Sequence, residues 1–341
     1  MPAASFDAEL EAVVGTGLPG AVAVAKGWEG AAGLANVDTG EPLTTTHRFR
    51  VQSVMKLFVA TVVLQLVDEG ALTLDWDAAP VATGVTVRQL LNHTSGLPNY
   101  HDDIIEMFEP YRSDPAYRWP LGPRELLAIA LDKPRLFPPG EGWAYSGSNF
   151  LAAGLLVEEL TGATLREELR RRIFEPLELG ATDLPSEASE TDGLARGYFP
   201  PDNPLIPGTD WVDVTELDLP FNWAGGGVVS TGSDLARFLE ALLGGELLPP
   251  RLREEMLRTV PSDWEETDGY GLGIGQVSSV MGKAHSPCGP AWGHLGLGPY
   301  TVIALGSEDG KRQAVVLANG PVMSDEAWIP LGRLTWACYC R

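Results

Sequence analysis

The chain has 341 residues, of which 44% are hydrophobic and 21% are charged, a composition typical of a globular protein with one large or two smaller domains. Its formal net charge of -22 at pH 7 disfavours nucleic acids and anionic membrane surfaces as partners, because like charges repel. No stretch reaches the roughly 18 apolar residues that a membrane span needs, and the first residues lack the basic and apolar regions of a secretion signal. We therefore expect a cytoplasmic protein.

The N-terminal part of the chain predicts one helix, several short strands and then a strongly apolar helix. Helical spacing of apolar residues predicts the first helix from Phe6 to Val14, and a run bounded by glycines predicts a strand at 20–27. Further short strands are expected at 33–35 and 48–51. Val, Leu, Phe and Ala then dominate residues 57–67, which predicts a buried helix.

After Gly70 the pattern changes to helices joined by loops rich in Pro and Gly. Helices are predicted, in chain order, at 86–91, 125–131, 149–160, 165–174 and 233–243. Between them, residues 197–222 are rich in Pro, Asp and Trp and predict a long ordered loop.

Strand-like runs return towards the C-terminus. They lie at 270–274, 291–294, 300–305 and 313–318, with a final helix over 322–336. Strands near both ends with helices between them predict an α/β fold whose sheet combines the two termini. We expect residues 1–70 and 215–341 to form the sheet domain, residues 71–214 to form a mainly helical subdomain, and the active site to lie between them.

A serine and a lysine stand three residues apart where the apolar helix begins. Residues at i and i+3 share one helix face, so the amine of Lys56 is expected beside the hydroxyl of Ser53. Burial lowers the pKa of a lysine, and a neutral amine can accept the serine proton. The helix N-terminus would favour an alkoxide and a developing oxyanion. Since Ser-x-x-Lys also occurs by chance, with serine as an N-cap, the pair needs partners elsewhere in the chain.

Two further residues are candidate partners. Tyr145 lies on a loop that leads into a predicted helix, where a phenol beside a cation such as Lys56 would relay a proton. His294 lies at the end of a predicted strand, where it would orient a substrate carboxylate or assist proton transfer. Each residue has a structural alternative, a packed tyrosine bonded to backbone or a histidine whose hydrogen bonds are satisfied.

Three short motifs occur in one order along the chain, namely Ser53-Val54-Met55-Lys56, Tyr145-Ser146-Gly147 and His294-Leu295-Gly296. Together they resemble the motifs of the penicillin-recognising serine enzymes, which include class C β-lactamases, D-alanyl-D-alanine carboxypeptidases, related esterases and acyltransferases. The class A motif set is Ser-x-x-Lys, Ser-Asp-Asn and Lys-Thr-Gly, so the tyrosine form here is similar to the class C and carboxypeptidase branch. The resemblance extends from residue 18 to residue 320. It implies an antiparallel sheet flanked by helices, with an all-helical subdomain.

The resemblance also implies a role for each matching residue. Ser53 would be the acylated nucleophile, Lys56 the amine that shares its proton, and Tyr145 the general acid and base. The oxyanion hole would consist of the backbone N–H groups of Ser53 and Leu297. The substrate-binding positions would be His294, Gly296, Leu297 and Gly147.

One position departs from the family pattern. The second motif usually ends in Asn, whose side chain holds the amide of a peptide or β-lactam, whereas this chain has Gly147. Losing such a hydrogen bond removes on the order of 1 kcal/mol of recognition. We therefore favour a serine hydrolase or acyltransferase that acts through an acyl-enzyme on a small ester, amide or peptide.

Two alternatives remain open. The chain would instead be a β-lactamase or D-alanyl-D-alanine carboxypeptidase with an altered second motif, or a catalytically inactive homologue that binds a ligand. A metal hydrolase is disfavoured because none of the five histidines forms an i,i+4 pair with a nearby acid, and no metal or cofactor is expected. The sequence leaves the acceptor, the substrate and the oligomeric state undetermined.

Several other segments carry weaker expectations. The aromatic residues of 100–119 and 197–223 would wall a pocket and favour a bulky acyl group. The acidic segments 187–192 and 263–268 predict solvated loops. The three cysteines, Cys288, Cys338 and Cys340, are an odd and sparse set that predicts free thiols rather than a disulfide framework or a metal site.

Overall fold

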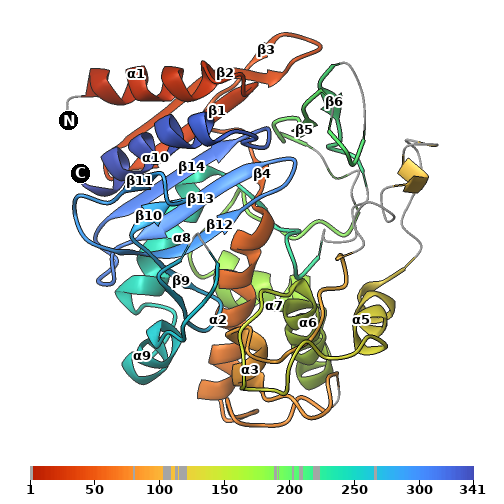
Figure 1. Cartoon of the computed structure of the whole chain (residues 1–341). Helices are drawn as coiled ribbons and strands as arrows, with labels where there is room; N and C mark the ends of the chain where they lie inside the picture. The colour runs from red at the N-terminus through yellow and green to blue at the C-terminus, as the bar shows by residue number, and fades with distance from the viewer. Residues whose placement is uncertain are drawn as a thin grey trace.

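The computed structural model describes residues 3–79, 81–102, 109–111, 114, 121–187, 190, 192–201, 203–206, 210–217, 223–264 and 267–341. Figure 1 shows a layered region that holds the large sheet and both chain ends, beside a region built mainly of helices. The sheet has eight antiparallel strands in the order β3-β2-β1-β14-β13-β12-β9-β8. Their bounds are β1 Gly20–Ala25, β2 Trp28–Asn36, β3 Glu41–Pro42, β8 Gly269–Tyr270, β9 Gly275–Val277, β12 Ala291–Gly296, β13 Thr301–Gly306 and β14 Gln313–Ala318.

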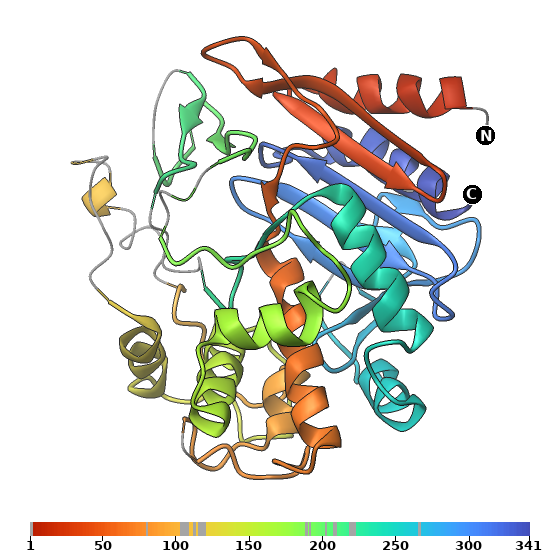
Figure 2. The same ribbon diagram turned by 180° about the vertical axis from the view of Figure 1, so that it is seen from behind.

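Helices cover both faces of this sheet. Helices α1 (Ala3–Val14) and α10 (Asp325–Tyr339) lie on one face, and α8 (Gly232–Gly244) lies on the other (Figures 1 and 2). The alternation of side chains along a strand explains the arrangement. In β13, Ile303 and Leu305 pack in the cluster that contains α1 and α10, whereas Val302 and Ala304 pack in the cluster that contains α8. All six residues of β13 are consequently buried.

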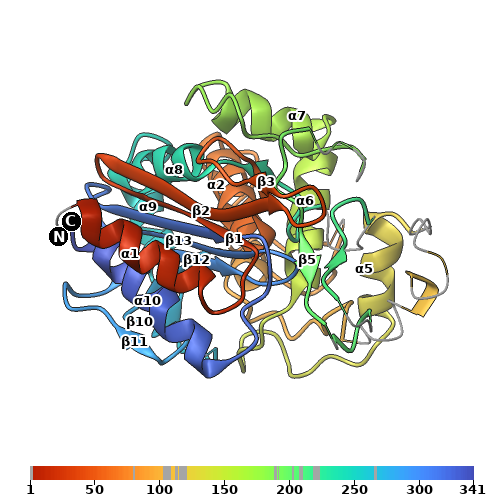
Figure 3. The same ribbon diagram turned by 90° about the horizontal axis from the view of Figure 1, so that it is seen from above.

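The second region contains the helices predicted in the middle of the chain. They are α3 (Val87–Leu91), α5 (Pro123–Leu131), α6 (Gly147–Thr161) and α7 (Leu165–Leu169), which a π-helical turn at Arg170–Phe174 extends. Helix α2 (Met55–Asp68) lies between these helices and the sheet, as the view from above shows (Figure 3). Eleven of the fourteen residues of α2, namely 55–64 and 66, are buried. It is therefore the central core element of the molecule.

Three short strand pairs lie outside the large sheet. They are β4 (Phe49–Arg50) with β7 (Val229–Ser230), β5 (Tyr198–Phe199) with β6 (Val212–Asp213), and β10 (Ser279–Val280) with β11 (Ala284–His285). The first pair fixes the chain immediately before Ser53. The predicted fold class is confirmed by this architecture together with the structural relatives described below. The domain boundaries at residues 70 and 215 stay a prediction.

The structure differs from the predicted elements in a few places. The segment predicted as a loop at 197–222 contains the β5–β6 pair, while residues 202, 207–209 and 218–222 lie outside the described part. Helix α9 (Pro250–Leu257) was not predicted, although a proline at its first position is a known helix start. The strand predicted at 270–274 is broken by Gly273, whose φ of +75° makes a turn between β8 and β9.

The prediction of free cysteines is wrong for two of the three. Cys288 and Cys340 form a disulfide with a Cα–Cα distance of 5.8 Å, and Cys338 is free and buried. The end of α10 packs against the β10–β11 region, where the indole of Trp336 donates to the carbonyl of Ala284 at 2.6 Å. This packing brings together two cysteines that are 52 residues apart in the sequence.

Candidate active site

Ser53 lies in a short 3-10 turn, Gln52–Val54, that runs directly into α2. Strand β12 passes very close to this turn. A Cβ atom at Gly296 would lie 2.5 Å from the carbonyl oxygen of Val51 and 3.2 Å from the backbone nitrogen of Ser53. Only glycine permits this approach, so the predicted importance of Gly296 has a steric reason.

Lys56 stands one turn along α2 and is only 2% exposed. Its Nζ atom donates hydrogen bonds to Ser53 Oγ at 3.1 Å and to the carbonyl oxygen of Gly225 at 3.1 Å. Burial lowers the pKa of Lys56 to about 7, because an apolar environment disfavours the charged form. A large fraction of Lys56 is therefore neutral at physiological pH and able to accept a proton.

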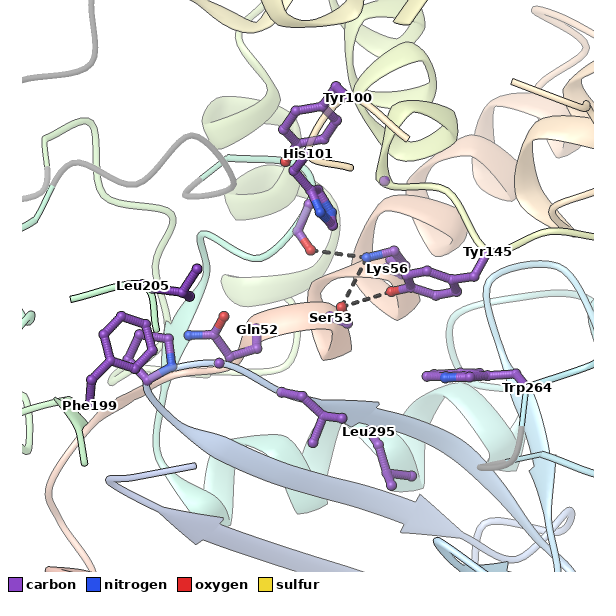
Figure 4. A pocket seen from close by; sticks show the side chains of 15 residues that line it. Gln52, Ser53, Lys56, Tyr100, His101, Tyr145, Phe199, Leu205, Trp264 and Leu295 are labelled. Carbon is purple, nitrogen blue, oxygen red and sulfur yellow. Dashed lines mark hydrogen bonds between the residues drawn. The ribbon is translucent and has the colours of Figure 1, made fainter. Parts of the chain in front are cut away.

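Tyr145 also contacts Ser53. Its hydroxyl donates to Ser53 Oγ at 2.8 Å, and Lys56 Nζ lies 5.0 Å from the centre of the tyrosine ring (Figure 4). The three residues predicted as catalytic thus converge on one oxygen atom. Tyr145 reaches it from a loop 92 residues further along the chain.

His93 holds this tyrosine loop and was not predicted as a site residue. Its Nδ1 atom accepts a hydrogen bond from the backbone N–H of Ser146 at 3.2 Å and contacts Asn149 Nδ2 at 3.0 Å. The ring centres of His93 and Tyr145 are 4.5 Å apart. Burial, with a smaller effect of Lys56, holds the pKa of His93 well below its usual value, so the imidazole is neutral. The only sequence signal was its place within residues 18–320, over which the chain resembles the family.

His294 is buried in β12 and is not among the residues that line the cavity. Its Nδ1 contacts the carbonyl of Leu295 at 2.6 Å and its Nε2 contacts the hydroxyl of Tyr270 at 3.0 Å. Burial and the nearby Lys56 lower the pKa of His294 to about 3. Both ring nitrogens of this neutral histidine thus have partners within the protein, and its ring centre lies 6.3 Å from that of Tyr145.

A cavity of about 240 Å³ opens next to Ser53. It is lined by Gln52, Ser53, Lys56, Tyr100, His101, Tyr145, Gly147, Phe199, Leu205, Gly225, Trp264, Leu295, Leu297, Gly298 and Pro299. Among these described residues there is no carboxylate, and Lys56 is the one basic amine. Most of the surface is apolar or aromatic, which suits an uncharged hydrophobic group beside the reacting serine.

The predicted aromatic walls contribute in part. Tyr100 and Phe199 come from the two aromatic-rich segments, whereas residues 103–108, 112–113 and 115–120 lie outside the described part of the chain. Trp264 corrects the interpretation of 263–268 as a solvated loop, because it lines the cavity with its ring centre 4.9 Å from that of Tyr145. Residues 265–266 of that segment are not described, nor are 188–189 and 191 of the other acidic segment.

Gly147, the first residue of α6, is closely surrounded. Its backbone N–H donates to Asn99 Oδ1 at 3.0 Å. A Cβ atom at this position would lie 3.0 Å from the ring of Tyr100 and 3.2 Å from both Asn99 Oδ1 and His101 Nε2. The absence of an asparagine here thus coincides with polar side chains from another segment that occupy the adjacent space.

No helix in the described ranges combines the length and apolarity needed to cross a bilayer. Within the same ranges, no three His, Cys, Asp or Glu side chains gather in a way that would hold a metal ion.

Comparisons with known proteins identify the family of the chain. The family model "Beta-lactamase" matches residues 6–335. The chain is similar to a penicillin-binding protein of Bacillus subtilis (strain 168), with 25% identity over 84% of this chain and 64% of that protein. It is also similar to esterase EstB of Burkholderia gladioli, with 30% identity over 82% of this chain and 81% of the esterase. Among solved structures, a D-stereospecific amidohydrolase from Streptomyces sp. has 32% identity and a TM-score of 0.81, covering 97% of this chain and 98% of its own.

Proposed function

Since this chain belongs to the beta-lactamase family, and is a serine hydrolase that acts on esters or amides through an acyl-enzyme, we propose that Ser53 is the nucleophile and that Lys56 and Tyr145 move its proton. The observation that carries this proposal is the convergence of Lys56 Nζ and the Tyr145 hydroxyl on Ser53 Oγ, at 3.1 and 2.8 Å. Two side chains that can carry a proton contact the same serine oxygen, an arrangement that nucleophilic catalysis requires and packing alone does not.

Acylation begins when Lys56 is neutral. The serine hydroxyl then donates to the lysine amine, which takes the proton as Oγ attacks the substrate carbonyl carbon. The developing oxyanion would accept hydrogen bonds from the backbone N–H groups of Ser53 and Leu297. Tyr145 gives its proton to the leaving alcohol or amine, and the Lys56 ammonium returns a proton to the phenolate. The carbonyl carbon exchanges its bond to the leaving group for a bond to Oγ.

Deacylation reverses these proton movements. Water attacks the acyl ester, its proton passes to the Tyr145 and Lys56 pair, and the Ser53 oxygen regains a proton as its bond to the acyl carbon breaks. Another nucleophile in the place of water would give acyl transfer. The apolar cavity favours an uncharged, hydrophobic acyl group, and the similarity to an esterase and to a D-stereospecific amidohydrolase supports esters and amides as the first substrates to test.

The proposal is tested by intact-mass measurement after mixing the protein with p-nitrophenyl esters of acetic and phenylacetic acid. The wild type should release p-nitrophenol in a burst and gain one acyl mass, and Ser53→Ala should do neither. Ser233→Ala, a change of a surface serine bonded to Glu29, is the matched control and should behave as wild type. An adduct that persists on Ser53→Ala would overturn the assignment of the nucleophile. Rapid nitrocefin turnover would instead favour a β-lactamase.

A further inference from the structure

Gln52, the residue before Ser53, has a strained backbone. Its φ of +52° lies in the left-handed region, which residues with a Cβ atom rarely adopt and glycine adopts readily. The residue begins the short turn that leads into α2, and it is only 2% exposed. A glycine would make the same turn with less strain. The reason for a glutamine at this position must therefore lie in its side chain.

The side-chain amide of Gln52 forms no hydrogen bond that would offset this strain. Its Nε2 atom is buried, and no acceptor for it exists among the described residues. A buried donor without an acceptor destabilises the fold, because its hydrogen bond to water in the unfolded chain is not replaced. Two unfavourable features thus meet at one residue next to the proposed nucleophile. Their coincidence indicates that the amide serves a ligand and not the fold.

The amide of Gln52 lies at the end of the cavity away from Tyr145. Figure 4 shows the two residues on opposite sides of Ser53, with the amide directed towards Phe199. A Cβ atom at Gly298, in the loop between β12 and β13, would lie 2.9 Å from Gln52 Oε1, so the amide lies against this loop. Since Tyr145 gives its proton to the leaving group, the opposite end would receive the acyl part of the substrate. The side chain of Gln52 therefore belongs to the loop side of the cavity, although its backbone belongs to the turn of Ser53.

This end of the cavity offers one polar group within apolar surroundings. Its other lining residues include Phe199, Leu205 and Pro299, which supply no charge, so a neutral ligand group fits better than an ion. A primary amide is both a donor and an acceptor, and rotation about its last bond exchanges the two atoms at little cost. A carboxamide on the ligand is the complementary group, because it accepts a hydrogen bond from the amide nitrogen of Gln52 and donates one to the oxygen.

We propose that Gln52 is a specificity-determining residue whose amide binds a primary carboxamide in the acyl part of the substrate through two hydrogen bonds. The inference rests on the proposed function of Ser53 and names the acyl group more narrowly. It assigns acyl groups with an apolar body and a carboxamide at the far end as better substrates than wholly apolar acyl groups of the same shape. The glutamine lowers the stability of the fold and provides recognition in return.

Four esters of matched shape test the inference. They are the p-nitrophenyl esters of 3- and 4-carbamoylphenylacetic acid and the two esters in which an isopropyl group replaces the carboxamide. At one ring position or both, the wild type should have the higher kcat/KM for the carboxamide ester. Gln52→Met, which keeps an unbranched side chain without the amide, should lower this preference about tenfold, since the two hydrogen bonds are lost. The intrinsic reactivities of the esters cancel, because each ester is compared between variant and wild type.

A control variant and a stability measurement distinguish recognition from folding. Gln65→Met changes a glutamine of α2 that donates to the carbonyl of Leu247 outside the cavity lining, and it should keep the wild-type preference. Gln52→Gly removes both the strain and the buried donor, so its melting temperature should equal or exceed that of wild type while the preference is lost.

Three results separate the failure of this inference from that of the proposed function. An unchanged preference in Gln52→Met would overturn the role of Gln52 while leaving Ser53 as the nucleophile. A wild type that favours the isopropyl ester at both ring positions would do the same. If none of the four esters acylates the wild type, the proposed function fails first and this inference fails with it.

Discussion

The two sides of the active site are built in different ways. The side that carries the proposed nucleophile consists of regular structure, since Ser53 lies in the 3-10 turn that leads into α2, Lys56 lies in α2 and Gly296 lies in a strand of the large sheet. The side that faces the rest of the substrate consists of loop residues such as His101 and Trp264. The difference indicates that the reaction is fixed by the core of the fold, while recognition is assigned to segments that can vary without disturbing it.

The energetic character of the two sides also differs. Lys56 is buried because α2 is apolar on almost all faces, and that burial gives the amine its low pKa. The loop side supplies apolar surface and a few hydrogen-bond donors without any buried charge among its described residues. A change on the first side should therefore affect every substrate, and a change on the second should affect substrates selectively. The following predictions test this division.

The largest effect is expected from Lys56→Met. Removing the proton acceptor should lower kcat by about a thousandfold for every ester, because general base catalysis contributes between about 10² and 10⁴. The folded-state pKa of about 7 lies below the ordinary value of 10.5, so wild-type folding becomes less favourable as pH falls from 10.5 to 7. Lys56→Met removes this cost, and its melting temperature at pH 7 should equal or exceed that of wild type. Lys26→Met, a change of a surface lysine, is the control. A loss of kcat for some esters and not for others would contradict the expectation that a change at Lys56 affects every substrate.

The pH dependence should show the same group. Protonated Lys56 cannot accept the serine proton, so kcat/KM should fall about tenfold for each pH unit below the Lys56 pKa of about 7. The profile should be alike for acetyl and phenylacetyl esters, because the same Lys56 amine takes the serine proton whichever acyl group is transferred. If kcat/KM instead begins to fall only near pH 4, the titration belongs to another group.

Trp264→Ala should act on one class of substrate. Its ring packs 4.9 Å from that of Tyr145 along the cavity, and removing it should lower kcat/KM for phenylacetyl esters about tenfold by loss of apolar contact. Acetyl esters should change less than twofold. Trp76→Ala, at an exposed tryptophan outside the cavity lining, is the matched control. If acetyl esters outcompete larger ones in the wild type, the cavity does not select a bulky acyl group.

The smallest effect on activity is expected at the disulfide. Cys288 and Cys340 do not line the cavity, so replacing both by serine should leave kcat/KM unchanged. The free energy of unfolding should fall by about 2 to 4 kcal/mol, because the bond constrains a loop of 52 residues in the unfolded chain. Urea unfolding measures this change, and each single serine variant should match the double variant. Three free thiols in the denatured wild type would show that the bond is absent.

The sequence alone determined the parts of this protein that depend on local geometry. The spacing of Ser53 and Lys56 at the start of an apolar run was sufficient to predict their contact, since residues three apart share a helix face whatever surrounds the helix. Helical and strand-like patterns predicted most of the helices and the four six-residue strands of the large sheet, β1, β12, β13 and β14, for the same reason. For Tyr145, the sequence left a proton relay and a packed tyrosine both open, and the resemblance implied the role of general acid and base.

Only the tertiary structure decided contacts between distant segments. The hydroxyl of Tyr145 reaches Ser53 across 92 residues, and Cys288 meets Cys340 across 52. His101 fills space beside Gly147, although neither residue is unusual in its own segment. Such contacts depend on how helices and strands pack, which is set by the sum of many weak apolar interactions and not by any short pattern. The contact between Ser53 and Lys56 could therefore be predicted from the chain, and the contacts around Gly147 could not.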